Sequence, residues 1–151
     1  MQAFRIADRR FPIFDGTGAS LIGGRWNSPG RAMIYAAETF AGAVLEILAH
    51  SNLGGIPQTH ALVETTIPEA VSMEAIGKSD LRGWGADDQI ASRRYGDQWL
   101  LEQRSAVLLV PSVVSGGRER NVLINPEHPG FARIVAGKPQ ELRWDKRLFQ
   151  R

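Results

Sequence analysis

The stretch Gly23–Arg31 (GGRWNSPGR) places two arginines, an amide and an indole within nine residues. Glycine adopts backbone angles that other residues avoid and proline fixes φ, so a bend of this composition can be both sharp and rigid. Arginine suits two-point recognition of phosphate oxygens. Arg25 and Arg31 are therefore candidate ligands for an anionic molecule, with Asn27 between them; the alternative is a pair of surface arginines in a turn.

Two residues that follow this loop could complete a site. Tyr35 lies in a short apolar run, where its ring either packs in the core or offers a flat surface to a planar group. Glu46 lies on the predicted helix 38–51, opposite the apolar stripe, and its neighbours there, Gly42 and Ala49, are small. A lone glutamate on a helix is usually solvated, but this face would let a ligand approach the carboxylate closely.

Ser112 and Asn121 are further candidates from the second half of the chain. Ser112 follows a buried-type strand and either forms the turn or orients a neighbouring group. No Gly-x-Ser-x-Gly elbow surrounds it, which disfavours a hydrolase nucleophile. Asn121 either satisfies backbone groups or lies at the binding site.

Several other catalytic patterns are excluded. Gly16–Leu21 begins like a dinucleotide fingerprint, but its sixth position is Leu and no βαβ unit surrounds it. There is no Walker A sequence. The three histidines, His50, His60 and His128, lack metal-ligand spacing, so we expect them to be solvated or hydrogen-bonded. The absence of cysteine excludes disulfides and thiolate chemistry.

Hydrophobic patterning predicts more strands than helices. The helices are 38–51, with apolar residues at helical spacing, and 97–104, with Gly96 just before it. The predicted strands are 4–6, 32–36, 60–67, 106–110, 121–124, 131–135 and 142–144. Because strands and helices do not alternate regularly, an α+β fold in a single domain, residues 1–151, is expected rather than a doubly wound sheet.

Residues 8–31 are predicted to form a long ordered loop. They are rich in Gly, Pro, Asp and Ser, which favours a loop. Their order is inferred from five residues of the buried type: Phe11, Ile13, Phe14, Leu21 and Ile22. Residues 69–90 give only a weak signal.

The composition is that of a soluble globular chain, with 43% hydrophobic and 23% charged residues. Fifteen arginines against three lysines indicate either recognition of phosphate or carboxylate, or the codon usage of a high-GC genome. The net charge of +2 and the lack of a basic run disfavour nucleic-acid binding. No signal peptide is recognisable and no apolar run approaches the roughly 20 residues of a membrane helix, so a cytoplasmic protein is expected.

Together these residues resemble the RES-domain family, the toxins of bacterial toxin–antitoxin pairs with Xre-type antitoxins. The similarity extends over nearly the whole chain, although residues 69–96 contain no recognisable motif. The matching segments are Gly23–Asn27 with Gly30, Ile34–Tyr35, Ala43–Glu46, Val110–Ser112, and Asn121–Pro126 with His128–Pro129.

The resemblance implies a fold like that of ADP-ribosyltransferases, a mixed sheet with a few flanking helices. It also implies an activity that consumes NAD⁺, by hydrolysis or by transfer of ADP-ribose to a protein. The family's arginine, tyrosine, glutamate and serine fall on Arg25, Tyr35, Glu46 and Ser112, with Asn27 and Arg31 as weaker matches. The resemblance also implies an antitoxin partner that blocks or occupies the cleft, and self-association as a homodimer.

A single carboxylate suits this chemistry. Nicotinamide leaves a cationic glycosidic bond as a neutral molecule, so the enzyme needs no strong general acid, unlike glycosidases with two carboxylates. Glu46 would either stabilise the positive charge that develops on the ribose in the transition state or hold the ribose hydroxyls, and Ser112 would orient a ribose hydroxyl or Glu46 itself. Arg25 would bind the pyrophosphate, Tyr35 would stack on the nicotinamide, and neither a metal nor a cofactor beyond NAD⁺ as substrate is required.

A different class of function stays open at this stage. Arg25 and Arg31 could bind a nucleotide or another phosphorylated ligand without catalysis. Release of nicotinamide from NAD⁺ separates the enzyme from such a binding module.

Overall fold

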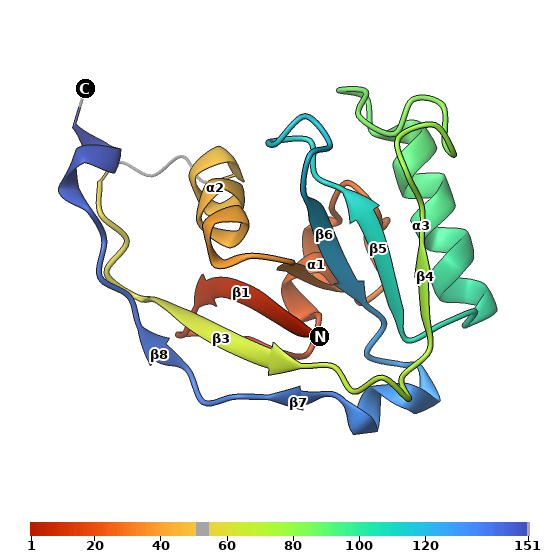
Figure 1. Ribbon diagram of the computed structural model, residues 1–151, viewed down its shortest axis with the longest axis horizontal. Helices are drawn as coiled ribbons and strands as arrows, with labels where there is room; N and C mark the ends of the chain where they lie inside the picture. The colour runs from red at the N-terminus through yellow and green to blue at the C-terminus, as the bar shows by residue number, and fades with distance from the viewer. Residues whose placement is uncertain (51–54, 151) are drawn as a thin grey trace.

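One eight-stranded sheet runs through the computed structural model, which describes residues 1–50 and 55–150 (Figure 1). The order across the sheet is β4-β5-β6-β2-β1-β3-β7, and β8 pairs with β3 beyond this path. All strand pairs are antiparallel except β4 with β5. The strands are β1 (Gln2–Asp8), β2 (Ile34–Ala37), β3 (His60–Thr66), β4 (Met73–Ala75), β5 (Val107–Pro111), β6 (Arg120–Ile124), β7 (Val135–Ala136) and β8 (Gln140–Glu141).

Two long helices pack on different parts of this sheet. Helix α2 (Phe40–His50) lies against β1 and β2, and α3 (Ile90–Glu102) covers the part built from β4, β5 and β6 (Figure 1). The side chain of Trp99 on α3 is fully buried with Leu108 of β5 and Leu123 of β6. The predicted near-continuous apolar strand is β5, in which every residue is buried, as expected for a strand covered on both faces.

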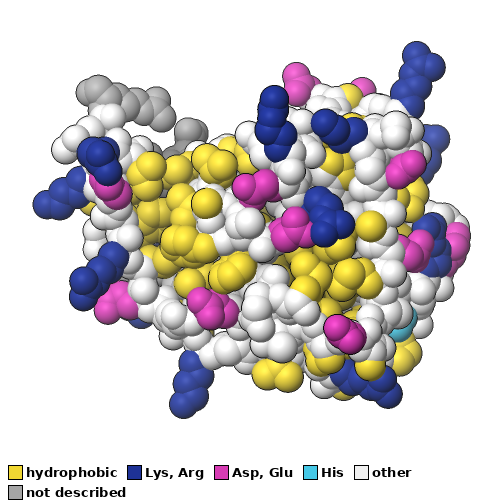
Figure 2. All heavy atoms as spheres, viewed as in Figure 1, with side chains coloured by type: hydrophobic (Ala, Val, Ile, Leu, Met, Phe, Trp, Pro, Cys, Tyr) yellow, Lys and Arg dark blue, Asp and Glu magenta, His cyan; other side chains and the backbone are white. Residues whose placement is uncertain are grey.

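Apolar side chains also gather around α2. A cluster of Ile6, Ala37, Ala43 and Leu62 is buried there, with Val44 and Ile47 of the predicted apolar stripe packed against it. Leu142 and Trp144 from the C-terminal segment pack on the same cluster. Figure 2 shows hydrophobic side chains exposed on this face, around α2 and the strands beside it. Ala43, Val44 and Ile47 of the predicted stripe therefore pack as expected, whereas Phe40, at the start of α2, is 43% exposed.

The α+β prediction is confirmed, because a mixed and mainly antiparallel sheet carries a few helices. The predicted helix 38–51 corresponds to α2, which begins two residues later at Phe40; Ser51 lies outside the described residues. The predicted strands at 4–6, 32–36, 60–67, 106–110 and 121–124 correspond to β1, β2, β3, β5 and β6 within a few residues.

The predicted start of the helix 97–104 is wrong. Helix α3 begins at Ile90, and Gly96, expected to precede the helix, lies inside it. A Cβ on Gly96 would come within 1.7 Å of the Trp26 carbonyl oxygen, so the glycine serves close packing of the helix on the loop. Tertiary contact here overrides the weak helix propensity of glycine.

The loop 8–31 is less buried than predicted. It contains a short helix, α1 (Thr17–Ile22), and three of the residues taken as core are exposed: Phe11 by 65%, Leu21 by 75% and Ile22 by 81%. Phe14 alone of that set stacks in the core, on Phe131 at 5.8 Å between ring centroids. Order in this loop comes from hydrogen bonds around Asn27, described below.

The C-terminal segment differs from the predicted strands 131–135 and 142–144. Residues Pro129–Arg133 form a 3₁₀ helix, η1, which begins where the side chain of His128 accepts a hydrogen bond from Gly130 N–H. Proline favours a helix start and cannot donate to a strand ladder, which explains the difference. The last strand is β8, and a second 3₁₀ helix, η2 (Lys146–Phe149), follows it.

No helix in the described part of the chain is both long and apolar enough to cross a membrane.

Candidate active site

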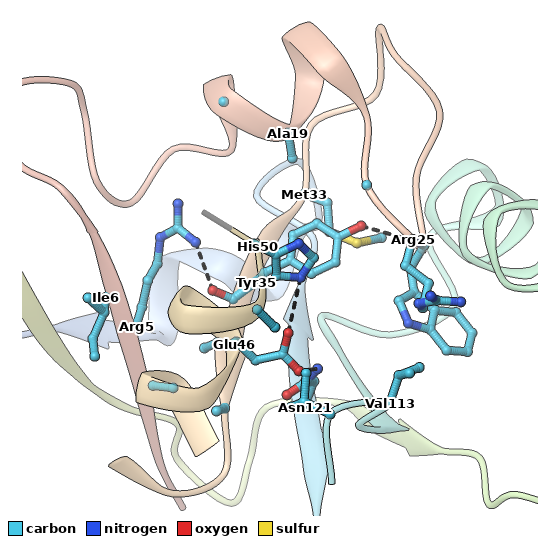
Figure 3. Close-up of a pocket in the computed structure, with 18 of the residues that line it drawn as sticks. Arg5, Ile6, Ala19, Arg25, Met33, Tyr35, Glu46, His50, Val113 and Asn121 are labelled. Carbon is cyan, nitrogen blue, oxygen red and sulfur yellow. Dashed lines mark hydrogen bonds and ion pairs between the residues drawn. The ribbon is translucent and has the colours of Figure 1, made fainter. Parts of the chain in front are cut away.

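A cavity of about 490 Å³ opens between α2, the centre of the sheet and the loop that follows α1 (Figure 3). We call it the Glu46 cavity. It brings together residues from β1, β2, α2, β6 and the loop 23–31, including Arg5, Arg25, Tyr35, Glu46, His50 and Asn121. Four of the predicted site residues, Arg25, Tyr35, Glu46 and Asn121, line it.

The carboxylate of Glu46 is held by three side chains. Its Oε1 accepts hydrogen bonds from Asn121 Nδ2 at 2.8 Å and from Ser112 Oγ at 3.1 Å, and its Oε2 lies 3.1 Å from His50 Nε2. Burial raises the pKa of Glu46, but the hydrogen bonds from His50, Asn121 and Ser112 outweigh burial, so the net pKa is below the ordinary value. Glu46 is thus ionised at neutral pH.

Small residues give access to this carboxylate. Ala43 and Ala49, on either side of Glu46 along the helix, both line the cavity. Gly42 does not; it packs near Thr39 and Glu119 at the start of α2. The open face expected around Glu46 is therefore present, with Ala43 in the place of Gly42.

Ser112 and Asn121 are brought to Glu46 by neighbouring strands. Ser112 comes directly after β5 and is 3% exposed, while Asn121 lies on β6, whose residues pair with those of β5. The buried Oδ1 of Asn121 has no hydrogen-bond partner among the described residues. Both side chains fix the orientation of the Glu46 carboxylate, and only Asn121 also lines the cavity.

Arg25 reaches the cavity from the loop between α1 and β2. Its Nη1 donates to the backbone carbonyls of Ala86 at 2.8 Å and Trp84 at 3.4 Å. These neutral partners leave its positive charge uncompensated by any carboxylate of the described residues within ion-pair distance. Such a guanidinium is suited to an anionic ligand.

Arg5 is a cavity residue that the sequence analysis missed. Its Nε donates to Ile13 O at 2.7 Å and its Nη1 to Tyr35 O at 2.8 Å, and burial lowers its pKa. Arg5 and Arg25 approach the cavity from opposite sides, with Tyr35, His50 and Glu46 between them (Figure 3). The local sequence FRIAD does not distinguish Arg5 from an exposed arginine on a strand at the edge of a sheet. Only the fold shows that Arg5 lines the cavity.

Tyr35 and Asn27 stabilise the loop 23–31 through hydrogen bonds. Tyr35 Oη donates to Asn27 Oδ1 at 2.6 Å and accepts from Trp26 N–H at 3.0 Å, and burial raises the pKa of Tyr35 well above its ordinary value. Asn27 Nδ2 donates to the carbonyls of Ala19 and Arg31, each at 2.9 Å. The ring of Tyr35 remains available to the cavity while its hydroxyl positions the loop.

The expectation that Asn27 contacts a ligand is not supported by this placement. Asn27 is fully buried and its amide is committed to the loop, because it satisfies backbone carbonyls that the tight bend leaves unpaired. Trp26 is also core, at 2% exposure. A Cβ on Gly24 would come within 2.6 Å of Tyr35 Oη, so the glycine permits this close approach.

Arg31 lies away from the Glu46 cavity. It faces a second hollow of about 370 Å³ on the outer side of α3, lined by Ser28, Arg31, Arg93 and Asp97 among others, which we call the α3 hollow. There Arg31 Nε lies 3.7 Å from Asp97 Oδ1. The sharp bend at Pro29–Gly30 sends Arg25 and Arg31 in different directions, so the predicted pair of clamps is wrong.

His50 is the second residue whose place was missed. It was expected to be solvated or hydrogen-bonded, and it is both, with a side chain that is 69% exposed and bonded to Glu46. Its spacing of four residues from Glu46 on one helix is the signal that could have indicated the pair. The hydrogen bond to Glu46 raises the pKa of His50 above its ordinary value.

Among residues 1–50 and 55–150, no group of three or more His, Asp or Glu side chains is placed to hold a metal ion.

Comparison with known proteins identifies the family. Residues 2–145 match the RES domain. The chain belongs to the RES-domain family. The resemblance read from the loop 23–31 and the segments after it is confirmed.

Relatives of this RES domain carry toxin names. "Prs ADP-ribosylating toxin" of Sphingobium sp. (strain YBL2) is 42% identical over 140 residues, which cover 90% of this chain and 86% of that protein. "Toxin Res" of Yersinia enterocolitica is 32% identical, covering 98% of this chain and 99% of that protein. "Toxin Res" of Pseudomonas putida is also 32% identical, covering 89% and 91%.

A solved structure shows the same fold. It is the crystal structure of the M. tuberculosis MbcT–MbcA toxin–antitoxin complex, with a TM-score of 0.74 and 17% identity, over 93% of this chain and 83% of the solved chain. The mixed sheet with α2 beside its centre is thus the architecture of this RES domain.

Proposed function

We propose that this RES domain is the toxin of a toxin–antitoxin pair and that it cleaves the nicotinamide–ribose bond of NAD⁺. The observation that carries the proposal is the ionised Glu46 carboxylate, held at the wall of a cavity of about 490 Å³ between two arginines. The names of the relatives support the class of function, since one is described as ADP-ribosylating and others as toxins.

The cavity offers a partner for each part of NAD⁺. Arg5 and Arg25 are held by neutral carbonyls, and their charge would be met by the pyrophosphate. The ring of Tyr35 would lie against the flat nicotinamide, and Glu46 would face the ribose between them.

The reaction then needs one carboxylate. As the C1′–N bond breaks, its electron pair passes to the pyridinium nitrogen and nicotinamide leaves as a neutral molecule. Positive charge develops on the ribose, where Glu46 stabilises it more strongly than in the ground state. Ser112 and Asn121 hold the carboxylate in place and reduce the reorganisation it must undergo.

An oxygen or nitrogen nucleophile next bonds to C1′ and loses its proton. Water would give free ADP-ribose, and a protein side chain would give an ADP-ribosylated protein. The name of the Sphingobium relative favours transfer to a protein. No metal and no further cofactor takes part in this scheme, and we place the reaction in the cytoplasm, where NAD⁺ is available.

The test is release of nicotinamide from NAD⁺ by the purified chain. We expect turnover in the wild type, loss of turnover in Glu46→Gln, and retained turnover in Glu127→Gln, whose residue is exposed in a turn and does not line the cavity. Binding of NAD⁺ without release of nicotinamide in the wild type would instead support the non-catalytic nucleotide-binding module.

An antitoxin partner forms part of the proposal. The structural neighbour was solved as a toxin–antitoxin complex, which supports a partner protein, and the family resemblance suggests an Xre-type antitoxin that blocks or occupies the cavity. Titrating the antitoxin into the nicotinamide assay should abolish turnover at one equivalent per active site. Light scattering of the chain alone would test the homodimer that the resemblance also suggests.

A further inference from the structure

The two oxygens of the Glu46 carboxylate differ in how firmly they are held. The partners of Oε1 are Ser112, which is 3% exposed, and Asn121 on the central strand β6, and both are packed within the fold. The partner of Oε2 is His50, the last residue of α2, whose side chain is 69% exposed. Oε2 is therefore the oxygen that a ligand can take over.

A protonated His50 opposes the chemistry assigned to Glu46. An imidazolium 3.1 Å from Oε2 occupies a lone pair and supplies the positive charge that the carboxylate should reserve for the ribose. The pKa of His50 is raised, so this competing cation persists closer to neutral pH than for a free histidine.

We propose that His50 is a positioning residue that holds Glu46 in the ligand-free protein and is displaced from Oε2 by the ribose of NAD⁺ before the glycosidic bond breaks. The inference rests on the proposed function. When the ribose takes Oε2, His50 turns toward solvent and its proton passes to water. A protonated His50 binds Oε2 more tightly than a neutral one, so NAD⁺ binds less well once the pH falls below the pKa of His50 in the ligand-free protein.

Other charged and titratable groups face the His50–Glu46 pair. They modify the displacement of His50 by the ribose but cannot account for it by themselves. Arg25, from the loop 23–31, lowers the pKa of His50, although less than Glu46 raises it. Arg5 from β1 and Tyr35 from β2 line the same cavity. Burial holds the pKa of Tyr35 far above neutral, so its hydroxyl does not titrate in the range that matters.

The pH dependence of kcat/KM tests the exchange, because this parameter reports groups of the free enzyme. In the wild type we expect kcat/KM for nicotinamide release to fall as the pH drops through the raised pKa of His50, and to level off below the lower pKa of the displaced histidine. In His50→Gln, a neutral amide keeps a hydrogen-bond donor near Oε2 but does not titrate. Relative to its own activity at pH 8, this variant should lose the acid limb down to the range of Glu46.

A matched control distinguishes the specific effect of replacing His50 from the effect of replacing any histidine. His128→Gln removes a histidine that caps η1, outside the cavity, and should keep the acid limb unchanged. An acid limb at the same pH in His50→Gln as in the wild type would overturn the inference. A uniform loss at every pH in His50→Gln would also overturn it, because it would show a structural role only.

A second measurement does not depend on turnover. NMR titration of the wild type should show a His50 pKa above 6.5 that falls when ADP-ribose saturates the protein, and a lower value in Glu46→Gln without ligand. A His50 pKa that ADP-ribose leaves unchanged would refute the exchange. By contrast, the absence of nicotinamide release from the wild type would refute the proposed function.

Discussion

The Glu46 cavity and the α3 hollow lie on either side of the loop 23–31. They differ in whether their charged side chains are paired with opposite charges. In the α3 hollow, the carboxylate of Asp97 accepts from Ser28 N–H at 2.8 Å and lies 3.7 Å from Arg31, so opposite charges neutralise one another. In the Glu46 cavity, Arg5 and Arg25 are held by backbone carbonyls and the Oε1 of Glu46 by neutral side chains.

The difference separates a structural site from one prepared for a ligand. Neutral hydrogen-bond partners fix the position of a charge without cancelling it, which is the electrostatic preorganisation that catalysis requires. Paired charges near the surface contribute little to stability or to binding. Of the three side chains that hold Glu46, His50 can carry a positive charge, and its side chain is the most exposed of the three, at 69%.

Removing the carboxylate should have the largest effect. In Glu46→Ala, kcat for nicotinamide release should fall by roughly 10²–10³-fold, as for the loss of other preorganised charge-stabilising groups. The Kd of NAD⁺ should change less than kcat, because the carboxylate acts mainly on the transition state. Single-turnover kinetics with a separate binding titration would measure both. An unchanged kcat would remove Glu46 from the catalytic site.

Removing a carbonyl-held cation should mainly weaken binding. Arg25→Ala should raise the Kd of NAD⁺ by roughly 10–100-fold, the cost of one or two hydrogen bonds to a charged group. Calorimetric titration of NAD⁺ into this variant and the wild type would measure the change. Equal affinities would show that Arg25 serves only to hydrogen-bond the carbonyls of Trp84 and Ala86 and does not bind NAD⁺.

The contrast between the two regions explains what the sequence could and could not predict. Glu46, Tyr35 and the bend at Gly23–Gly24 were identified because helical spacing and glycine positions are local signals. Arg25 and Arg31 look equivalent in the sequence, and only the path of the backbone around Pro29 assigns them to different hollows. Arg5 was missed because its partners, Ile13 O and Tyr35 O, come from distant segments.

The same distinction applies to the elements. Helix α2 follows from helical periodicity and strand β5 from its continuous apolar run, whereas the start of α3 depends on contacts made 67 and 69 residues away. Ser92 Oγ donates to Arg25 O at 2.9 Å and Arg93 donates to Gly24 O, which extends the helix before Gly96. Hydrogen bonds between residues so far apart in the chain produce no periodic pattern in the sequence, so the pattern could not predict them.

A substitution at Gly96 would test whether α3 positions the loop 23–31. A methyl group in Gly96→Ala would collide with the Trp26 carbonyl, so we expect overpacking to cost about 1–3 kcal/mol of unfolding free energy. Thermal unfolding should show Tm lowered by roughly 2–4 °C for each kcal/mol. Gly85→Ala is the control, because its nearest neighbour would be 3.9 Å away. Equal Tm values for the two variants would show that helix and loop separate readily.

Arg31→Ala should have the smallest effect and is the sharpest test of the comparison. The side chain is partly exposed and its ion pair with Asp97 is long, at 3.7 Å, so its loss should change stability by less than about 1 kcal/mol. The Kd of NAD⁺ and kcat should stay within about twofold of the wild type, because Arg31 faces a different hollow. The same binding and turnover assays would measure this beside Arg25→Ala. If Arg31→Ala weakened NAD⁺ binding as much as Arg25→Ala, the two hollows would act as one site and the separation of paired from unpaired charge would fail.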